Sequence, residues 1–533
     1  MNKNRTVLEE VIESGEEENG SIEFKSQLSR DIHLVDGKRE SLEAQLRYRV
    51  RSGNGTATYV IGVKDDGEIS GLNPDDFSES MDVLSLLAKN VGSRITDVST
   101  WNTGEDDKLV GLVEVVDGEE SSNSNDLIIG TAGHVDHGKS TLIGSLVTGT
   151  ADNGEGGTRS YLDVKPHEID RGLSADLSYA VYGFTDDGGI NRMNNPDRNQ
   201  DRSRVVEESD KLVSFVDTVG HQPWLRTTIR GLVGQRLDYG LLVVAADDGV
   251  TQTTREHLGL LIATELPLIV AITKTDIVSD EEVSNVQMEI EKLLRNVNRT
   301  PLSMERHTVE TALDEISTSV SPIIQTSAVT LEGFDRLDKL FQNLPKQTTS
   351  KGEFRMYIDK VYNVDGVGPV VSGSVQSGEL EEGDELFVGP LSDGSFRKTK
   401  ARSIEMHYHR IKKAESGQMV SVSLSNVDKN ELNRGMALTQ KTEEEPTATR
   451  EFEADIMVLN HPTSITDGYE PVIHLETISE TSVITPKDNM IAGDKGKAKF
   501  KFKFNKYHVQ EGQRFIFREG SSKGVGTVTK VLD

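Results

Sequence analysis

The sequence of 533 residues contains no cysteine, two tryptophans and 5% aromatic residues in total. Without cysteine there is no disulfide framework and no thiolate metal or redox site, which argues against a secreted, disulfide-stapled protein. No apolar run approaches the roughly 18 residues that a membrane-spanning helix requires, and the first twenty residues lack the apolar core of a signal peptide. We therefore expect a soluble, cytoplasmic protein without a membrane partner.

Basic residues are also in the minority, because 59 Lys and Arg stand against 88 Asp and Glu, for a formal net charge of −29. So acidic a composition is not typical of nucleic-acid-binding proteins. It is typical of proteins from a salt-rich cytoplasm, where the screening length shrinks to about 3 Å at 1 M and like charges repel weakly. The composition favours this second interpretation, a salt-adapted protein.

The length predicts several domains, and the composition divides the chain into four segments. Residues 1–119 are predicted to form an α+β accessory domain, with a hairpin in "ATYVIGVKDDGEISGL" and a helix over residues 75–95. Residues 120–346 alternate apolar runs with helical periodicity, which predicts a doubly wound, mostly parallel sheet. The short, turn-rich β runs of residues 352–444 and 448–533 predict two β-barrels.

The stretch "GHVDHGKS", residues 133–140, lies between a strand-like run and a helical run and fits the pattern of a phosphate-binding loop. Its glycines allow backbone amides to point at phosphates. Lys139 can reach the β and γ oxygens, and Ser140 can offer a hydroxyl to Mg²⁺. On its own, the pattern could also be a chance glycine-rich turn.

Three further motifs follow later strand-like runs. In "DTVGH", Asp217 can hold the magnesium shell and Gly220 can bring an amide to the γ-phosphate; in "TKTD", Asp276 can accept hydrogen bonds from N1 and N2 of guanine, donors that adenine lacks. In "TSAVT", the backbone near Ala328 can meet the guanine O6. Because open α/β sheets bind ligands at the carboxyl ends of their strands, the four motifs together predict a GTP site. The predicted nucleotide-binding residues are Gly133, His134, Val135, Asp136, His137, Gly138, Lys139, Ser140, Thr141, Asp217, Gly220, Thr273, Lys274, Asp276, Ser327, Ala328 and Val329.

These motifs resemble those of the translational GTPases, the superfamily of elongation factor Tu and elongation factor 1-alpha. The wording of "GHVDHGKST" and "DTVGH" is close to that superfamily, and the resemblance continues through both predicted barrels in "VDGVGPVVSGSVQSGELEEGDEL" and "GQRFIFREGSSKGVGTVTKVL". Within it, "RVRSGNGTATYVIGVKDDGEISGL" and "HEIDRGLSADLSYAVYGF" are most similar to the archaeal relatives of animal GTP-binding protein one, here expected to be haloarchaeal. In those relatives the motif that begins at Thr273 also starts with Thr rather than Asn.

The resemblance assigns roles to residues of the two switch segments. It makes His221 the catalytic residue that positions the attacking water; the alternative is a histidine that caps a helix. It makes Ser174 a magnesium ligand, unless Ser174 is an ordinary surface serine. Val135 and Leu173 resemble the apolar pair that separates the histidine from the nucleotide until a partner docks, although both could be packing residues. The predicted metal ligands are Ser140, Ser174 and Asp217.

The resemblance implies a GTP-hydrolysing switch of the elongation-factor type, in which GTP or GDP and Mg²⁺ bind and a partner triggers hydrolysis. The implied partners are the ribosome, tRNA or another RNA, and the implied form is a monomer. A GTPase coupled to mRNA decay and its machinery, and the GTPase subunit of a sulfate-activating enzyme, are alternatives within the same enzymology. A scaffold that binds GTP without hydrolysing it is the alternative from another class.

The predicted second barrel contains the alternating stretch "KAKFKFKFNK". Strand geometry places its lysines on one face and its apolar residues on the other, so we expect the phenylalanines to fill the barrel. The lysines would either form a solvated strand face that protects a sheet edge or bind an RNA backbone. The lysines are Lys497, Lys499, Lys501 and Lys503, and the apolar residues are Ala498, Phe500, Phe502 and Phe504.

The role of the N-terminal segment is open between two hypotheses. "SIEFKS", with Glu18 and Glu23, faintly resembles Schlafen-type domains, some of which use carboxylates and a metal to cut RNA. Acidic residues are abundant in this sequence, so such a spacing arises easily by chance. A binding or autoregulatory module is the prediction we favour.

Overall fold

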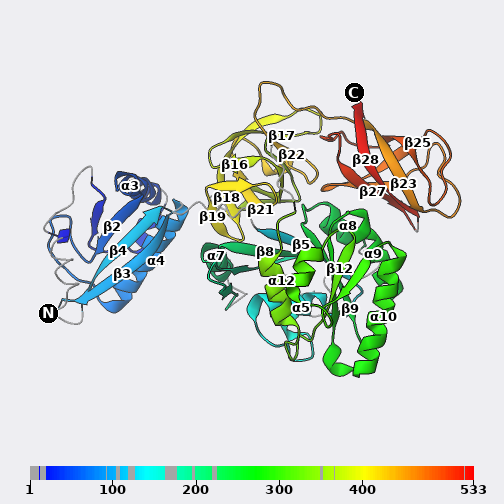
Figure 1. Ribbon diagram of the computed structural model, residues 1–533. Helices are drawn as coiled ribbons and strands as arrows, with labels where there is room; N and C mark the ends of the chain where they lie inside the picture. The colour runs from blue at the N-terminus through cyan, green and yellow to red at the C-terminus, as the bar shows by residue number, and fades with distance from the viewer. Residues whose placement is uncertain are drawn as a thin grey trace. The chain divides into compact units, whose positions relative to one another are not determined.

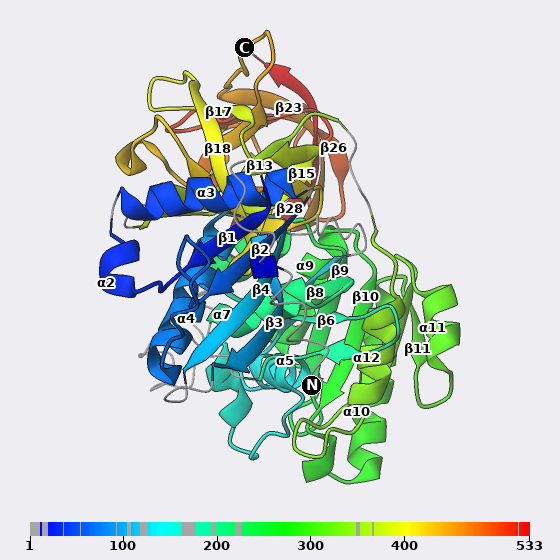
Figure 2. The same ribbon diagram turned by 90° about the vertical axis from the view of Figure 1, so that its left-hand side faces the viewer.

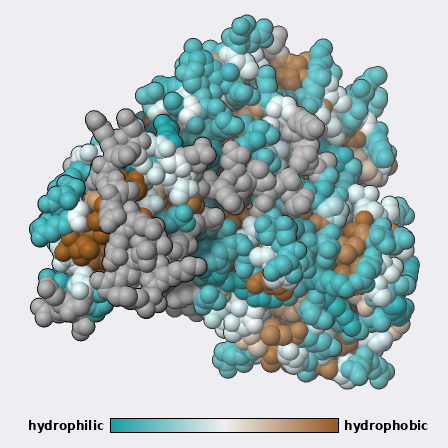
Figure 3. All heavy atoms as spheres, turned by 60° about the vertical axis from the view of Figure 1, so that its left-hand side comes forward, coloured by the Kyte–Doolittle hydropathy of each residue, from teal (hydrophilic) through white to brown (hydrophobic). Residues whose placement is uncertain are grey.

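The computed structural model describes residues 11–12, 20–35, 37–53, 55–91, 93–103, 108–117, 126–162, 177–194, 199–218, 225–347, 352–364, 367–520 and 522–532. The chain divides into two compact units, residues 1–120 with 410–412 and residues 121–409 with 413–533 (Figure 1, Figure 2). No helix within the described ranges is long and apolar enough to span a membrane. Among the residues that Figure 3 colours, hydrophilic ones predominate and hydrophobic ones occupy smaller, separate areas.

The N-terminal unit is an α+β domain, as predicted. Its four-stranded sheet has the order β1-β2-β4-β3, with β1 and β2 parallel and the other pairs antiparallel. Apolar residues of the two longer helices pack with the strands into one core. The predicted helix over residues 75–95 is too long, because the alternating residues after Asn90 form a strand from Ser93. The elements are β1 (Ile22–Lys25), α2 (Arg30–His33), α3 (Lys38–Ser52), β2 (Thr56–Ile61), α4 (Pro74–Asn90), β3 (Ser93–Asn102) and β4 (Leu109–Asp117).

The second unit begins with the predicted doubly wound sheet, with strand order β11-β12-β10-β9-β5-β8-β6-β7. The pairs from β11 to β8 are parallel, and β6 and β7 are antiparallel at one edge. The five apolar runs of the sequence form β5, β8, β9, β10 and β12, buried almost throughout because helices cover both faces. The strands are β5 (Leu127–Gly133), β6 (Ser178–Phe184), β7 (Ile190–Asn191), β8 (Lys211–Asp217), β9 (Tyr239–Ala245), β10 (Leu268–Thr273), β11 (Thr300–Ser303) and β12 (Val320–Gln325). The helices are α5 (Lys139–Thr148), α7 (Asn199–Glu207), α8 (Leu225–Val233), α9 (Gln252–Ala263), α10 (Asp280–Asn296), α11 (Val309–Glu315) and α12 (Phe334–Asn343), with short turns η1 (Gly157–Tyr161) and η3 (Thr275–Ile277).

Two antiparallel β-barrels follow this sheet, as predicted. In the first, the strand order is β13-β22-β17-β18-β21-β15-β14, and β13 also pairs with β15. The second is a closed barrel of order β23-β26-β25-β24-β27-β28. The first contains β13 (Arg355–Tyr357), β14 (Lys360–Val364), β15 (Gly368–Ser377), β16 (Glu379–Glu381), β17 (Glu385–Gly389), β18 (Arg397–Met406), β19 (His409–Ile411), β20 (Lys413–Glu415), β21 (Met419–Leu424), η4 (Lys429–Glu431) and β22 (Ala437–Gln440). The second contains β23 (Glu451–Asn460), β24 (Val472–Leu475), β25 (Ile478–Pro486), β26 (Lys495–Phe502), β27 (Arg514–Glu519) and β28 (Ser522–Leu532).

The lysine-phenylalanine stretch forms β26, with one departure from the prediction. Phe500 and Phe502 are fully buried among the aromatic residues of the barrel core. Phe504 was expected in that core, but it is 61% exposed, because the strand ends at Phe502 and the alternation ends with it. The lysines form a solvated strand face, as one interpretation predicts, but they do not protect a sheet edge, since β26 pairs with β23 on one side and β25 on the other.

The lysines of β26 form ion pairs across the barrel surface. Glu451 accepts from Lys499 and, at 2.8 Å, from Lys501, while Lys497 lies 3.7 Å from Asp455. Lys503, just beyond the strand, lies 2.7 Å from Glu470. The basic face of this strand is therefore largely neutralised by acidic residues of the same barrel; we call these four lysines and their carboxylates the lysine ladder.

The first barrel contacts the parallel sheet through the turn between β18 and β19. His407 and Tyr408 in this turn have positive φ of 48° and 67°, which directs His407 toward β8. Its Nε2 lies 2.9 Å from the Ser214 hydroxyl, and His409 Nδ1 lies 3.1 Å from the Ser203 hydroxyl on α7. Burial lowers the pKa of His407 to about 3, so this imidazole is neutral.

Candidate nucleotide-binding site

The phosphate-binding loop connects β5 to α5 at the carboxyl end of the sheet. Gly133 has φ 151°, and a Cβ there would lie 2.3 Å from the Val243 carbonyl oxygen, so another residue would displace β9. Gly138 has φ 79° and caps the start of α5, and Asp136 also has a positive φ of 59°. Positive φ at these positions turns successive amides in one direction, which is the geometry that binds phosphate.

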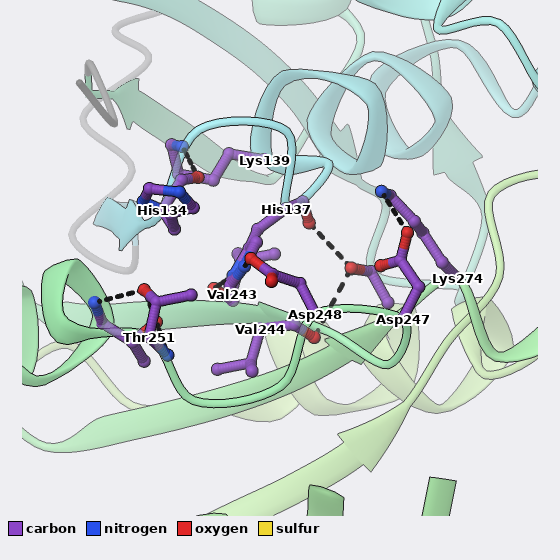
Figure 4. A network of polar contacts seen from close by, with 11 residues as sticks. His134, His137, Lys139, Val243, Val244, Asp247, Asp248, Thr251 and Lys274 are labelled. Atoms are coloured by element: carbon purple, nitrogen blue, oxygen red, sulfur yellow. Dashed lines mark hydrogen bonds and ion pairs between the residues drawn. The ribbon is translucent and has the colours of Figure 1, made fainter. Parts of the chain in front are cut away.

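Lys139 is held inside this loop. Its side-chain amino group donates a 2.7 Å hydrogen bond to the His134 carbonyl oxygen, and the residue is 7% exposed (Figure 4). Burial lowers the pKa of Lys139 to about 8, although Asp217 and Asp136 oppose the shift. An ammonium group with so little water around it gains strongly from a phosphate oxygen, because the local dielectric is low.

Two histidines hold the loop in place, His257 on a neighbouring helix and His137 within the loop itself. His257, buried on α9, accepts a hydrogen bond at Nδ1 from the Gly133 amide at 3.0 Å, and burial lowers its pKa to about 3. The Nε2 of His137 lies 3.0 Å from the Asp248 carboxylate, to which it donates as a neutral ring. Burial lowers the pKa of His137 as well. Both rings therefore orient the loop without adding positive charge.

The predicted metal ligands Ser140 and Asp217 lie together. The Ser140 hydroxyl donates to Asp217 Oδ2 at 2.6 Å, and the Thr131 hydroxyl donates to Oδ1 of the same carboxylate at 2.8 Å. A hydroxyl beside a carboxylate is a hard oxygen donor set of the kind that Mg²⁺ binds together with water and phosphate. In the described part of the chain, no three His, Cys, Asp or Glu residues gather as a metal site.

Thr273, at a position where the superfamily commonly has Asn, keeps a structural link between two motifs. Its hydroxyl donates to the His137 carbonyl oxygen at 2.7 Å and lies 3.5 Å from the Val244 carbonyl oxygen. Lys274 has a positive φ of 58°, and its amino group lies 3.0 Å from Asp247. Asp276 follows in η3 with an exposed side chain. The arrangement leaves this carboxylate accessible at the end of β10.

The last predicted motif follows β12. Ser327 is buried, and its hydroxyl accepts from the Thr330 amide at 3.1 Å, while Ala328 and Val329 are progressively more exposed. The Ala328 carbonyl oxygen accepts from the Asp152 amide at 2.8 Å. The Asp152 carboxylate in turn accepts hydrogen bonds from the backbone amides of Gly154, Gly156 and Thr158 and from the Thr158 hydroxyl. The segment after α5 is thereby joined to the predicted guanine loop.

Several predicted residues lie outside the described ranges. They are the catalytic candidate His221, the γ-phosphate amide of Gly220, the metal-ligand candidate Ser174 and the gate residue Leu173. Val135, the other gate residue, is half-buried in the loop, and Thr141 belongs to the first turn of α5. The roles of the four undescribed residues stay predictions.

Comparison with known families identifies three consecutive matches. Residues 124–348 match the elongation factor Tu GTP binding domain, residues 368–439 match elongation factor Tu domain 2, and residues 445–532 match the elongation factor Tu C-terminal domain. The chain belongs to the translational GTPases of the elongation factor Tu type. The match to the GTP binding domain includes the phosphate-binding loop and the start of α5, residues 133–141.

Two curated relatives align with nearly the whole of this chain, including its N-terminal unit. The chain is 32% identical to GTP-binding protein 2 of Mus musculus over 97% of this chain and 88% of that protein, and 33% identical to GTP-binding protein 1 of Xenopus laevis over 92% and 76%. Elongation factor 1-alpha of Methanopyrus kandleri is 33% identical over 61% of this chain and 71% of its own length. The family match therefore includes the N-terminal unit in the first two relatives.

Solved structures share the fold at lower sequence identity. A bacterial selenocysteine-specific elongation factor has a TM-score of 0.57 and 23% identity, over 76% of this chain and 58% of its own. Translation elongation factor SelB of Methanococcus maripaludis, in complex with the GTP analogue GppNHp, has a TM-score of 0.56 and 21% identity, over 76% and 80%. At these identities the likeness shows the fold alone.

Sequence reasoning missed the residues that support the site from outside the motifs. His257, Asp248 and Asp152 each bond to a motif residue or its neighbour, but none belongs to a motif. A buried histidine in the amphipathic helix after β9 was the available signal for His257. Asp152 carried a weaker one, since Asp followed by Asn and Gly favours a turn with side-chain acceptance of backbone amides.

In the N-terminal unit, Glu23 does not present a free carboxylate. It lies 2.7 Å from Arg49 Nε and 2.5 Å from Lys25 Nζ, with 1% of its side chain exposed. Arg49 also donates to the Gly20 carbonyl oxygen. A carboxylate already bound by two cations is poorly suited to hold a catalytic metal ion, which weighs against the nuclease hypothesis. Glu18 lies outside the described residues.

Proposed function

We propose that this chain is a GTP-hydrolysing molecular switch of the elongation-factor type, which acts as a cytoplasmic monomer on the ribosome or another RNA. The observation that carries the proposal is that Lys139, the Ser140–Asp217 pair and Asp276 all lie at the carboxyl ends of strands β5, β8 and β10 of one mostly parallel sheet. This edge is where open α/β sheets bind nucleotides. Along the chain, the motif predicted to bind phosphate comes first, the motif predicted to bind the metal second and the motif predicted to bind the base third.

Each described group has a separate task in this proposal. The amides of residues 133–139 and the Lys139 ammonium hold the phosphates, and their fixed orientation favours the charge that builds up during phosphoryl transfer. Ser140, Asp217 and the predicted ligand Ser174 would hold Mg²⁺, which when bound neutralises phosphate charge. His221 would orient the attacking water.

Guanine selection is tested by Asp276→Asn. A carboxylate accepts from both N1–H and the 2-amino group of guanine, whereas a carboxamide donates one hydrogen bond and accepts one, which suits the 2-oxo group and N1–H of xanthine. The variant should bind GTP at least 10-fold more weakly and gain affinity for xanthosine triphosphate. The measurement is competition against a fluorescent nucleotide, with Asp280→Asn on the exposed start of α10 as the control. Equal GTP affinity in both variants would remove Asp276 from the base site.

The catalytic role of His221 is tested by His221→Ala in single-turnover GTP hydrolysis. The substitution should slow the chemical step at least 10-fold and leave GTP affinity within a factor of about two, since orienting water is a task of the transition state. An unchanged single-turnover rate would refute the assignment. A wild-type protein that binds GTP without turnover would favour the scaffold.

The partner is tested by hydrolysis in molar KCl with and without ribosomes from a salt-loving archaeon. Strong stimulation would support a ribosomal partner and make tRNA the next ligand to test. A slow rate that ribosomes do not change would favour a GTPase coupled to RNA decay. Stimulation that depends on sulfate and ATP would favour the subunit of a sulfate-activating enzyme.

A further inference from the structure

The loop after β26 is built around one buried carboxylate. Glu480 on β25 is 6% exposed and accepts four hydrogen bonds from this loop: from the Phe504 amide at 2.6 Å, the Asn505 amide at 3.0 Å, the Asn505 side chain at 2.8 Å and the Tyr507 hydroxyl at 2.7 Å. Tyr507 also packs edge-on against the buried Phe502 ring, with centroids 4.9 Å apart. The loop is therefore fixed in shape on the surface of the second barrel.

This fixed loop presents Phe504 to solvent. At 61% exposure, Phe504 is more exposed than the other large hydrophobic side chains in the part of the chain that the structure describes. Single exposed apolar residues are common and carry no function by themselves. Here, however, an aromatic ring is displayed by a loop whose conformation is set by four hydrogen bonds to one carboxylate, so the ring is held in place before any partner arrives.

The cations beside Phe504 differ from those of the lysine ladder. Arg450 donates a hydrogen bond to the Phe504 carbonyl oxygen, and Lys506 lies two residues further along the loop; both residues are exposed. Among the described residues, neither has a carboxylate within ion-pair distance, whereas Lys497, Lys499, Lys501 and Lys503 each have one. Phe504 therefore has two exposed cationic residues close to it, Arg450 through its hydrogen bond and Lys506 through the chain.

Two carboxylates near this loop already have partners. Glu480 is buried and accepts four hydrogen bonds from the loop, and Glu470 is paired with Lys503. The surface around Phe504 thus combines an exposed aromatic ring with two exposed cationic side chains, of which Arg450 is anchored to the loop by its hydrogen bond to the Phe504 carbonyl oxygen. That combination fits a nucleobase with phosphates on either side of it.

We propose that Phe504 is a stacking platform for an unpaired base of single-stranded RNA, with Arg450 and Lys506 binding the adjacent phosphates. The inference deepens the proposed function and rests on it only for the choice of RNA as the partner. The proposed RNA-binding surface is thus the loop after β26, and not the lysine face of β26 that the sequence suggested. A protein partner is the competing occupant, but a single exposed ring between two cations offers little apolar area for a protein interface, which needs a contiguous patch.

The test is equilibrium binding of the full chain to a fluorescein-labelled uridine dodecamer, measured by anisotropy at 0.1 M and 1 M KCl. Phe504→Ala should weaken binding about 5- to 100-fold, the range expected for one lost base stack. Phe504→Trp should retain affinity, and its indole fluorescence should be quenched when RNA is added. Because Phe504 is exposed, neither variant is expected to perturb the barrel.

Two lysine variants serve as a matched pair. Lys506→Ala should weaken binding and reduce the dependence of affinity on salt by about one phosphate contact, while Lys497→Ala on the ladder should change neither. An oligomer of the same length with abasic sugars should bind wild type and Phe504→Ala equally. This comparison separates base stacking from attraction to the backbone.

Three outcomes would overturn the inference. One is equal RNA affinity in wild type and Phe504→Ala. Another is an absence of RNA binding in a wild-type protein that still hydrolyses GTP, which would leave the proposed GTPase intact. The third is a Phe504→Ala variant with normal RNA affinity but lost ribosomal stimulation, which would assign the ring to a protein partner. Failure of GTP hydrolysis with RNA binding retained would instead count against the proposed function alone.

Discussion

The polar network under the phosphate-binding loop and the lysine ladder on β26 are both made of charged and hydrogen-bonding side chains, but they differ in burial. Lys139, His137 and His257 are nearly excluded from water, and each has a hydrogen-bond partner, which for Lys139 lies within its own loop. The ladder lysines keep between 42% and 69% of their side chains exposed. The number of polar contacts is therefore a poor guide to their importance.

Burial decides what each network contributes. In the low dielectric under the loop, a lost partner leaves a group that water cannot satisfy, so the geometry is strongly specified. On the barrel surface, solvent and salt compete with every ion pair, and an exposed pair is worth at most about 1 kcal/mol. We expect substitutions to separate the two regions clearly, and the inner face of β26 to behave like the buried network.

The largest effect is expected on the inner face of β26. Phe500→Ala should lower the free energy of unfolding of its barrel by about 3–5 kcal/mol, because the ring is fully buried. Its centroid lies 4.9 Å from that of the Phe515 ring and 5.2 Å from that of the Phe452 ring. Phe504→Ala is the matched control and should change stability by about 0.5 kcal/mol or less. Urea unfolding followed by near-ultraviolet circular dichroism makes the comparison. Similar losses in both variants would contradict the outward placement of Phe504.

The next effect concerns the buried ammonium. Lys139→Ala should weaken GTP binding about 10- to 100-fold, the range for a hydrogen bond to a charged group. Titration with a fluorescent GTP analogue measures it, and Lys499→Ala, which removes an exposed lysine of the ladder, is the control. Equal GTP affinities in the two variants would contradict the claim that the buried lysine contributes more than the exposed one.

A smaller effect should appear as pH dependence. The folded-state pKa of His407 is about 3, below its ordinary value near 6.5, so only the unfolded chain takes up this proton between the two values. The contribution of the neutral His407 ring to the free energy of unfolding is complete above pH 6.5 and falls by about 1.4 kcal/mol per pH unit below it. In His407→Gln this part of the slope should vanish. Denaturant midpoints measured from pH 7 to pH 5 test this, and parallel curves for the two proteins would exclude a neutral buried ring.

The smallest effect is expected on the ladder itself. Lys499→Ala should change the free energy of unfolding by less than about 1 kcal/mol, because its bond to Glu451 is exposed and Lys501 remains beside the same carboxylate. The two lysines hold the pKa of Glu451 below its ordinary value. The difference should shrink further in 1 M KCl, where the screening length is about 3 Å. A loss that grows with salt would show that the ladder is more than a surface feature.

The sequence predicted those parts of the molecule that local patterns determine. Apolar runs predicted β5, β8, β9, β10 and β12, and the motifs after β5, β8 and β10 predicted the edge of the sheet at which Lys139, Asp217 and Asp276 lie. Alternation predicted that Phe500 and Phe502 are buried, but alternation does not mark where a strand ends, so it placed Phe504 inside as well. The same limit extended the helix after Pro74 beyond Asn90.

Contacts between distant segments could not be predicted in this way. The Gly133–His257 bond joins residues 124 positions apart, and the Glu451 pairs depend on the register between β23 and β26. That register is set by which residues of both strands face the core, and a single strand does not contain this information. The lysines were therefore visible in the sequence, but the carboxylates that neutralise them were not.

Strand β8 connects the nucleotide site to the first barrel. Asp217 at its carboxyl end accepts the Ser140 hydroxyl, and Ser214, three residues earlier, meets His407 of the barrel. Three residues of extended strand span about 10 Å, and a strand hydrogen-bonded on both sides is stiff along its axis. Strand β8 therefore joins the carboxylate at the nucleotide site to the His407 turn of the first barrel through three residues of strand that is paired on both sides.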